Sequence, residues 1–83
     1  MKRVVLYGRE GCCLCDEARA ALLSARRHHQ FELEELDIES DPALLRRYLE
    51  RIPVVTIDGV EAFELFVEED ELVRRLLAPA APR

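Results

Sequence analysis

The sequence has almost no lysine and no long apolar run. Its 83 residues contain one lysine and carry a formal net charge of −5 at pH 7. Nucleic-acid binding needs clustered cationic side chains interleaved with aromatic ones, and because no such patch occurs, the composition argues against a nucleic-acid partner. The first apolar run, residues 4–7, is too short for a secretory signal or a membrane span. We therefore expect a cytoplasmic protein that does not bind membranes.

The length leaves room for one core only. A chain of 83 residues is typical of a single compact domain of modest stability. We expect residues 1–77 to form this domain as a monomer. Residues 78–83, which contain only Ala, Pro and Arg, are expected to be a frayed tail.

In the first half of the chain the spacing of the apolar residues changes twice. Residues 4–7 are an unbroken run of strand formers, followed by a loop that contains Gly8 and Gly11. From Leu14 to residue 29 the apolar residues recur at helical spacing, with acidic residues at the start and basic ones at the end. Residues 31–38 then alternate as an edge strand, and a shift of parity predicts an irregularity near Glu35.

The second half contains one more helix, a hairpin and a closing helix. Pro42 follows a capping residue and starts a helix that reaches residue 49. Residues 53–57 and 60–66 are strands joined by Asp58-Gly59, and residues 69–77 close the domain as a helix. Strand-helix-strand units cross over into parallel neighbours, and the hairpin adds one antiparallel strand. The sequence therefore predicts an α/β domain, with a four-stranded mixed sheet and helices on both faces.

All three cysteines lie within four positions, at 12, 13 and 15, between the first strand and the first helix. In a reducing compartment, clustered thiols indicate catalysis or metal binding rather than a structural disulfide. The N-terminus of a helix stabilises a thiolate, because free N–H groups and a partial positive charge face it. Cys12 has this position. Cys15 lies nearly one turn further along the same face, within reach of Cys12 but less exposed.

The charges around the cysteines are mixed, and other interpretations stay open. Arg9 would stabilise the Cys12 thiolate, whereas Glu10, Asp16 and Glu17 would oppose it. A closed zinc site needs four ligands, and the histidines lie at the far end of the first helix. An iron-sulfur cluster shared between two subunits, or a soft ion such as Cu(I), remains the alternative. Cys13 is either a neutral occupant of its position or a third thiol that exchanges with the others.

These motifs together resemble those of a glutaredoxin. Cys12-x-x-Cys15 stands at the first strand-to-helix junction, and Ile52-Pro53 stands at the start of the third strand. The chain is similar above all to small bacterial glutaredoxin-like proteins of unassigned function, in which Gly-Cys-x-Leu-Cys-Asp and a later Pro-Val run ending in Asp-Gly recur. Two positions depart from the glutaredoxin pattern. Cys13 stands where the family usually has Pro, and Phe63-Glu64 stands where a Gly-Gly near the charged end of glutathione is usual.

The resemblance implies a thioredoxin-like fold and a set of roles. Cys12 corresponds to the nucleophile, Cys15 to the resolving thiol and Pro53 to a cis-proline that lies against them, so that Ile52 offers its backbone to a bound thiol substrate. We include Arg9 among the substrate-binding residues. The implied activity is thiol-disulfide exchange on protein disulfides or glutathione mixed disulfides, with no bound cofactor or metal and with glutathione as a candidate reductant. A degenerate fold used only for binding is the third interpretation.

Overall fold

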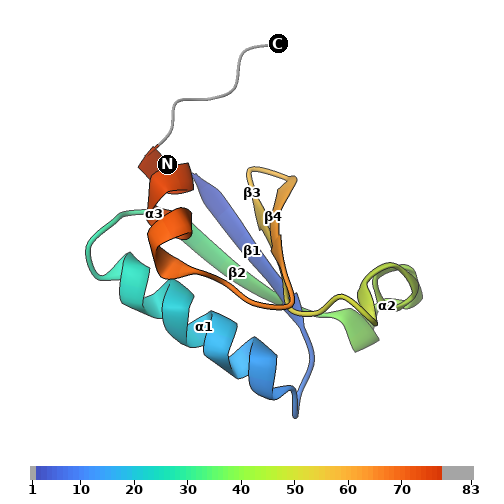
Figure 1. Cartoon of the computed structure of the whole chain (residues 1–83). Helices are drawn as coiled ribbons and strands as arrows, with labels where there is room; N and C mark the ends of the chain where they lie inside the picture. The colour runs from blue at the N-terminus through green and yellow to red at the C-terminus, as the bar shows by residue number, and fades with distance from the viewer. Residues whose placement is uncertain (1, 78–83) are drawn as a thin grey trace.

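The computed structural model describes residues 2–77, which form one mixed sheet with three α-helices (Figure 1). In chain order the elements are β1 (Arg3–Gly8), α1 (Cys13–Arg26), β2 (Glu32–Asp37), a short 3-10 helix (Ile38–Ser40), α2 (Pro42–Tyr48), β3 (Val54–Ile57), β4 (Val60–Glu64) and α3 (Glu69–Leu77). The strand order in the sheet is β2-β1-β3-β4. The four-stranded mixed sheet is thus confirmed. The tail predicted over residues 78–83 lies outside the described residues, and the extent of the single domain stays a prediction.

The direction of β3 differs from the prediction. β1 and β2 are parallel, but β3 is antiparallel to β1, with Leu6 opposite Val55. The physical reason is the length of α2, whose seven residues rise only about 10 Å, whereas a strand of six residues such as β1 spans about 20 Å. α2 therefore stays near the end of the sheet where β1 and β2 finish, and the chain enters β3 from that end (Figure 1).

The irregularity predicted near Glu35 is also wrong. β1 and β2 keep one continuous register from Arg3 opposite Glu32 to Gly8 opposite Asp37. The shift of apolar parity has another cause. Leu33 and Leu36 are half-buried on opposite faces of β2, and Ile38 already belongs to the 3-10 helix. The sheet's register shift lies instead between β3 and β4, at Val55 and Thr56.

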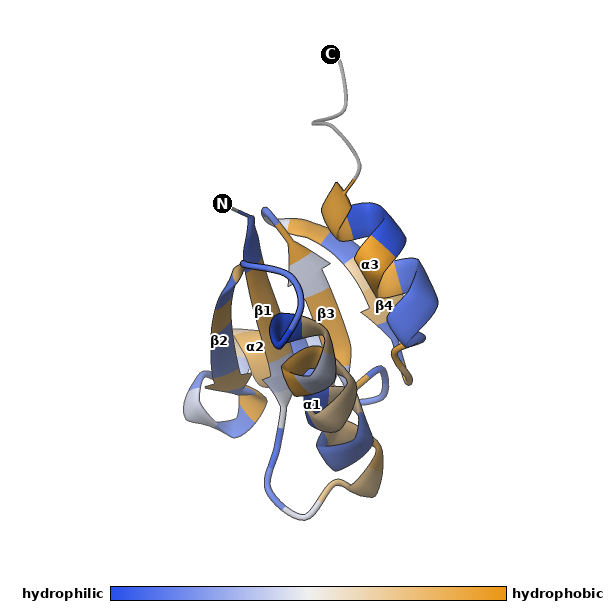
Figure 2. Cartoon of the chain, turned by 90° about the vertical axis from the view of Figure 1, so that its left-hand side faces the viewer, coloured by the Kyte–Doolittle hydropathy of each residue, from blue (hydrophilic) through white to orange (hydrophobic). Residues whose placement is uncertain are grey.

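Two apolar clusters hold the sheet between its helices. The first, which we name the aliphatic cluster, joins β1 and β3 to α1 and α3 through Val4, Leu6, Ala18, Leu22, Ala25, Phe31, Val55 and Leu72. The second, which we name the thiol cluster, consists of Cys15, Ile38, Tyr48, Ile52 and Val54, with Tyr7, Cys12, Leu44 and Leu45 packed against it. Figure 2 shows α1 in front of the sheet and α2 behind it, and α3 packs on the same cluster as α1. Cys15 thus belongs to the thiol cluster, and Cys12 packs against it.

The helices are short. Among residues 2–77, no helix has both the length and the apolar character needed to cross a membrane.

Candidate active site

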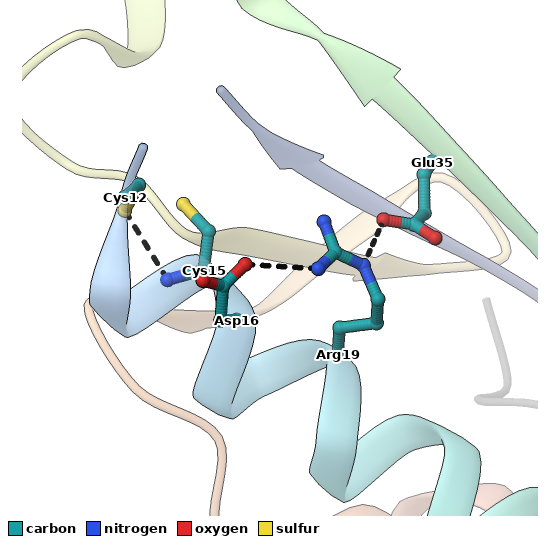
Figure 3. A network of polar contacts seen from close by, with 5 residues as sticks. All are labelled: Cys12, Cys15, Asp16, Arg19 and Glu35. Carbon is teal, nitrogen blue, oxygen red and sulfur yellow. Dashed lines mark hydrogen bonds and ion pairs between the residues drawn. The ribbon is translucent and has the colours of Figure 1, made fainter. Parts of the chain in front are cut away.

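Cys12 is the N-cap of α1. Its backbone is extended, with φ −95° and ψ 110°, and its Sγ accepts a hydrogen bond from the backbone N–H of Cys15 at 3.2 Å (Figure 3). A cap residue accepts one of the N–H groups that the first turn leaves free, at the positive end of the helix dipole. The half-buried Cys12 sulfur therefore lies where a negative charge is stabilised, as the sequence predicts.

Cys15 is buried in the first turn of α1 and packs against the end of β1. Only 1% of its surface is exposed. A Cβ atom added to Gly8 would lie 2.9 Å from the Cys15 Sγ, which is shorter than real Cβ contacts. Gly8 is therefore required for close approach rather than for flexibility, whereas Gly11 adopts a positive φ of 78°. Sequence reasoning identified Gly8 only as the end of a strand, because nothing in the sequence shows which side chain packs on it.

The surroundings of Cys15 keep it protonated. Burial, a hydrogen bond with Cys12 and the nearby charges of Cys12 and Asp16 raise the pKa of the Cys15 thiol from 9.0 to about 11, although the Arg9 backbone partly opposes this. Cys12 is half-buried and Cys15 is fully buried, so two thiols three residues apart differ in their access to solvent. This difference is the one that an attacking and a resolving cysteine need.

The third strand begins beside the two cysteines. The Ile52-Pro53 peptide bond is cis, as the resemblance implies. Ile52 is a member of the thiol cluster, against which Cys12 packs, and Pro53 is fully buried. The Pro53 carbonyl accepts a hydrogen bond from the backbone N–H of Leu65 at 2.8 Å, which ties the end of β4 to this site. The structure thus brings Cys12, Cys15 and Ile52-Pro53 together from distant parts of the chain.

Arg9 lies in the loop between β1 and α1. Its guanidinium is half-exposed and pairs with Glu39 of the 3-10 helix, with an N–O distance of 3.9 Å. This pair turns the Arg9 side chain toward the 3-10 helix. A contribution of Arg9 to substrate binding stays a prediction.

The remaining thiol, Cys13, is exposed at the first position of α1. Within the part of the chain that the structure describes, no group of three or more His, Cys, Asp or Glu side chains is placed to hold a metal ion. The three thiols point into different surroundings, since Cys15 is buried and Cys13 faces solvent. The geometry within one chain therefore gives no support to the alternative of a soft-metal site.

Sequence reasoning missed a polar network next to the cysteines. Arg19 on α1 donates to Asp16 at 2.9 Å and to Glu35 of β2 at 2.5 Å (Figure 3). The spacing of Asp16 and Arg19, three residues apart on a helix, was a readable signal. The ion pair between Arg19 and Glu35 could not be read from the sequence, because it depends on the pairing of β2 with β1.

A half-exposed thiol at a helix start, a buried partner thiol and a cis-proline beside them, on a sheet of this topology, define a glutaredoxin-like domain. A family model described as "Glutaredoxin-like domain (DUF836)" matches residues 3–77, and the chain belongs to this family. A comparison with curated proteins gives no match.

Solved structures agree with this family and fold. Protein Ne2328 from Nitrosomonas europaea is 35% identical, with a TM-score of 0.79 and coverage of 90% of this chain and 91% of that one. Target protein XcR50 from X. campestris is 32% identical, with a TM-score of 0.73 and coverage of 92% and 99%. The glutaredoxin-like protein NrdH-redoxin from Escherichia coli, 23% identical with a TM-score of 0.63 and coverage of 95% and 99%, shares the fold. The thioredoxin-like fold is thus confirmed, and the family indicates a redox function.

Proposed function

We propose that the protein is a cytoplasmic thiol-disulfide oxidoreductase that reduces protein disulfides or glutathione mixed disulfides through Cys12 and Cys15. One observation carries the proposal. The Cys12 sulfur lies half-exposed at the N-terminus of α1 and accepts the N–H of Cys15, whose own sulfur is buried within the same turn. Inert packing would not require one thiol of the pair to face the solvent at the positive end of a helix.

The reaction has two exchange steps. The Cys12 thiolate attacks one sulfur of the substrate disulfide, and the other substrate sulfur leaves as a thiolate with the bonding electron pair. Cys15 then loses its proton and attacks Cys12. The bond between Cys12 and the substrate breaks, the second substrate sulfur leaves as a thiolate, and the protein holds a Cys12–Cys15 disulfide. The substrate gains two electrons. Two molecules of an external thiol such as glutathione then return two electrons to the protein and become joined as a disulfide.

The rim of the site favours a protein as the substrate. Leu14 is 43% exposed next to Cys13, and Leu65 is 44% exposed next to Pro53. Phe66, the following residue, is 67% exposed. Exposed apolar side chains on the segments that carry or adjoin the site stabilise the docking of a larger partner, because their burial removes apolar surface from water.

A comparison of two substrates tests the proposal. The reduced protein is given a glutathione mixed disulfide and a protein disulfide in parallel, as wild type and with Cys12→Ser, Cys13→Ser or Cys15→Ser. We expect Cys12→Ser to lose turnover of both substrates by about 10³-fold or more, since the nucleophile is removed. Cys15→Ser should fail with the protein disulfide, and Cys13→Ser should resemble the wild type. If the wild type reduces neither substrate, the proposal is wrong.

A further inference from the structure

A cavity of about 340 Å³ opens beside Cys15, between the loop after β1, the first turns of α1 and β2. Leu6, Gly8 and Leu36 form part of its wall, and Cys15 is part of its lining. The charged groups that face it come from three elements and are Arg9, Glu10, Asp16, Arg19, Glu35 and Asp37. A cavity of this size with polar walls has room for several water molecules. The exchange steps described above make no use of it.

Asp16 is held at this cavity by a chain of ion pairs. Arg19 binds Asp16 through one nitrogen at 2.9 Å and Glu35 through another at 2.5 Å. Figure 3 shows the Asp16 carboxylate between the first turn of α1 and the Arg19 guanidinium. Cys15 and Asp16 both line the cavity. The Asp16 side chain is 68% exposed, so water reaches its carboxylate from the cavity side and from solvent.

The resolving step has an electrostatic obstacle at this point. In the reduced protein, burial first, then Cys12 and, as the smallest cause, the negative charge of Asp16 raise the pKa of Cys15 to about 11. Once Cys12 is bonded to the substrate, burial and the Asp16 charge still oppose the Cys15 thiolate. If the Cys15 proton moves to Asp16, the carboxylate becomes neutral as the thiolate forms. The two negative charges that oppose one another are then never present together.

We propose that Asp16 accepts the Cys15 proton through a water molecule in this cavity during the resolving step, and that Arg19 is the residue that positions it. The inference rests on the proposed function. The Cys15 S–H bond breaks, the water passes the proton to the Asp16 carboxylate, and the Cys15 thiolate attacks the Cys12 sulfur. The substrate sulfur leaves with the bonding electrons and takes up a proton from Asp16 or from solvent. No further oxidant or reductant is needed.

The two roles open to Asp16 predict effects of opposite sign. If Asp16 acts only as a nearby charge, Asp16→Asn removes repulsion, lowers the pKa of Cys15 and speeds resolution. If Asp16 is the proton acceptor, the same change slows resolution by about tenfold or more, since general-base contributions reach about 10²–10⁴-fold. The direction of the change therefore decides between the two roles.

The experiment uses the reduced full-length protein with Cys13→Ser as the background. Stopped-flow mixing with less than one equivalent of 5,5′-dithiobis(2-nitrobenzoate) releases one coloured thiolate when Cys12 attacks and a second one when Cys15 resolves. Asp16→Asn is compared with Asp16→Glu, Arg19→Gln and Glu17→Gln. Glu17 is the matched control, because it is an exposed acid of the same helix that takes no part in the cavity wall.

We expect Asp16→Asn to keep the first release and slow the second, Asp16→Glu to recover part of the rate, and Glu17→Gln to resemble the background protein. Between pH 6 and 9 the rate of the second release in Asp16→Asn should rise about tenfold per pH unit, which is steeper than in the background protein. An unchanged or faster second release in Asp16→Asn overturns the inference. Absence of the second release in the background protein itself would instead contradict the proposed function.

Discussion

The aliphatic cluster and the thiol cluster lie in one small domain but differ in what they contain. The first is built of aliphatic side chains and one phenylalanine, closed between the sheet and two helices. The second contains a buried thiol and a buried tyrosine, and a half-buried cysteine packs on it. Backbone strain also occurs beside the second cluster, since Leu65 next to Pro53 has a φ of 73°, which a bulky residue rarely adopts. Stability and chemistry are therefore carried by different parts of a chain of 83 residues, and substitutions in the two clusters should have different consequences.

The largest loss of stability is expected in the aliphatic cluster. Leu22 of α1 has no exposed surface, and Leu22→Ala should lower the free energy of unfolding by about 2–5 kcal/mol, because it removes buried methyl groups and leaves a cavity. Urea unfolding followed by circular dichroism measures this loss. Turnover per folded molecule should stay near that of the wild type. A turnover that falls further than the folded fraction would contradict the separation of the two clusters.

Gly8→Ala tests the contact between β1 and the buried thiol. The added methyl group would lie 2.9 Å from the Cys15 sulfur, and such overpacking costs about 1–3 kcal/mol. We expect most of this loss to disappear when Gly8→Ala is introduced into a Cys15→Ala protein, since the clashing sulfur is then absent. Thermal unfolding of the four proteins of this double-mutant cycle gives the interaction energy. Additive effects of the two changes would show that the cost of Gly8→Ala arises elsewhere.

The pH dependence of stability provides a smaller effect, specific to the thiol cluster. The pKa of Cys15 is about 11 in the folded protein against an ordinary value of 9.0, so the folded state favours the protonated thiol. Its contribution is therefore fully present below pH 9 and is lost as the pH rises toward 11. The reduced protein should lose about 2 kcal/mol relative to Cys15→Ser over this range. Urea unfolding of both proteins at matched pH values checks this, and parallel curves would exclude a raised pKa.

The smallest expected effect concerns the strained turn at the rim of the site. Leu65→Gly relieves the positive φ but removes a partly exposed apolar side chain, so stability should change by no more than about 1 kcal/mol. Reduction of a protein disulfide should slow several-fold, whereas reduction of a small disulfide should keep its rate. Steady-state rates with both substrates separate these outcomes. Equal slowing of both would show that Leu65 supports the cysteines rather than a docked protein.

Much of this organisation could be predicted from local patterns. The cap position of Cys12, the burial of Cys15 one turn later and the start of α2 at Pro42 depend on residues within a few positions of one another. The cis-proline came from the resemblance instead, because X-Pro bonds are cis in only about 5–6% of cases.

The remaining features depend on contacts between distant segments. The direction of β3 depends on α2, which is too short to span the sheet. The apolar residues of β2 change parity because helices cover both faces of the sheet, and not because the strand is irregular. The approach of Gly8 to Cys15 and the ion pair between Arg19 and Glu35 exist only once β1, β2 and α1 have packed together. Sequence patterns do not specify which side chains meet in this way.

In the proposed reaction Cys12 and Cys15 act as an unequal pair, and Cys13 takes no part. A single turnover of reduced wild-type protein with one equivalent of a protein disulfide, quenched with acid, alkylated and analysed by peptide fragmentation, tests it most directly. We predict a Cys12–Cys15 disulfide with the alkyl group on Cys13. An alkylated Cys15, with Cys12 joined to Cys13 or still a free thiol, would contradict it.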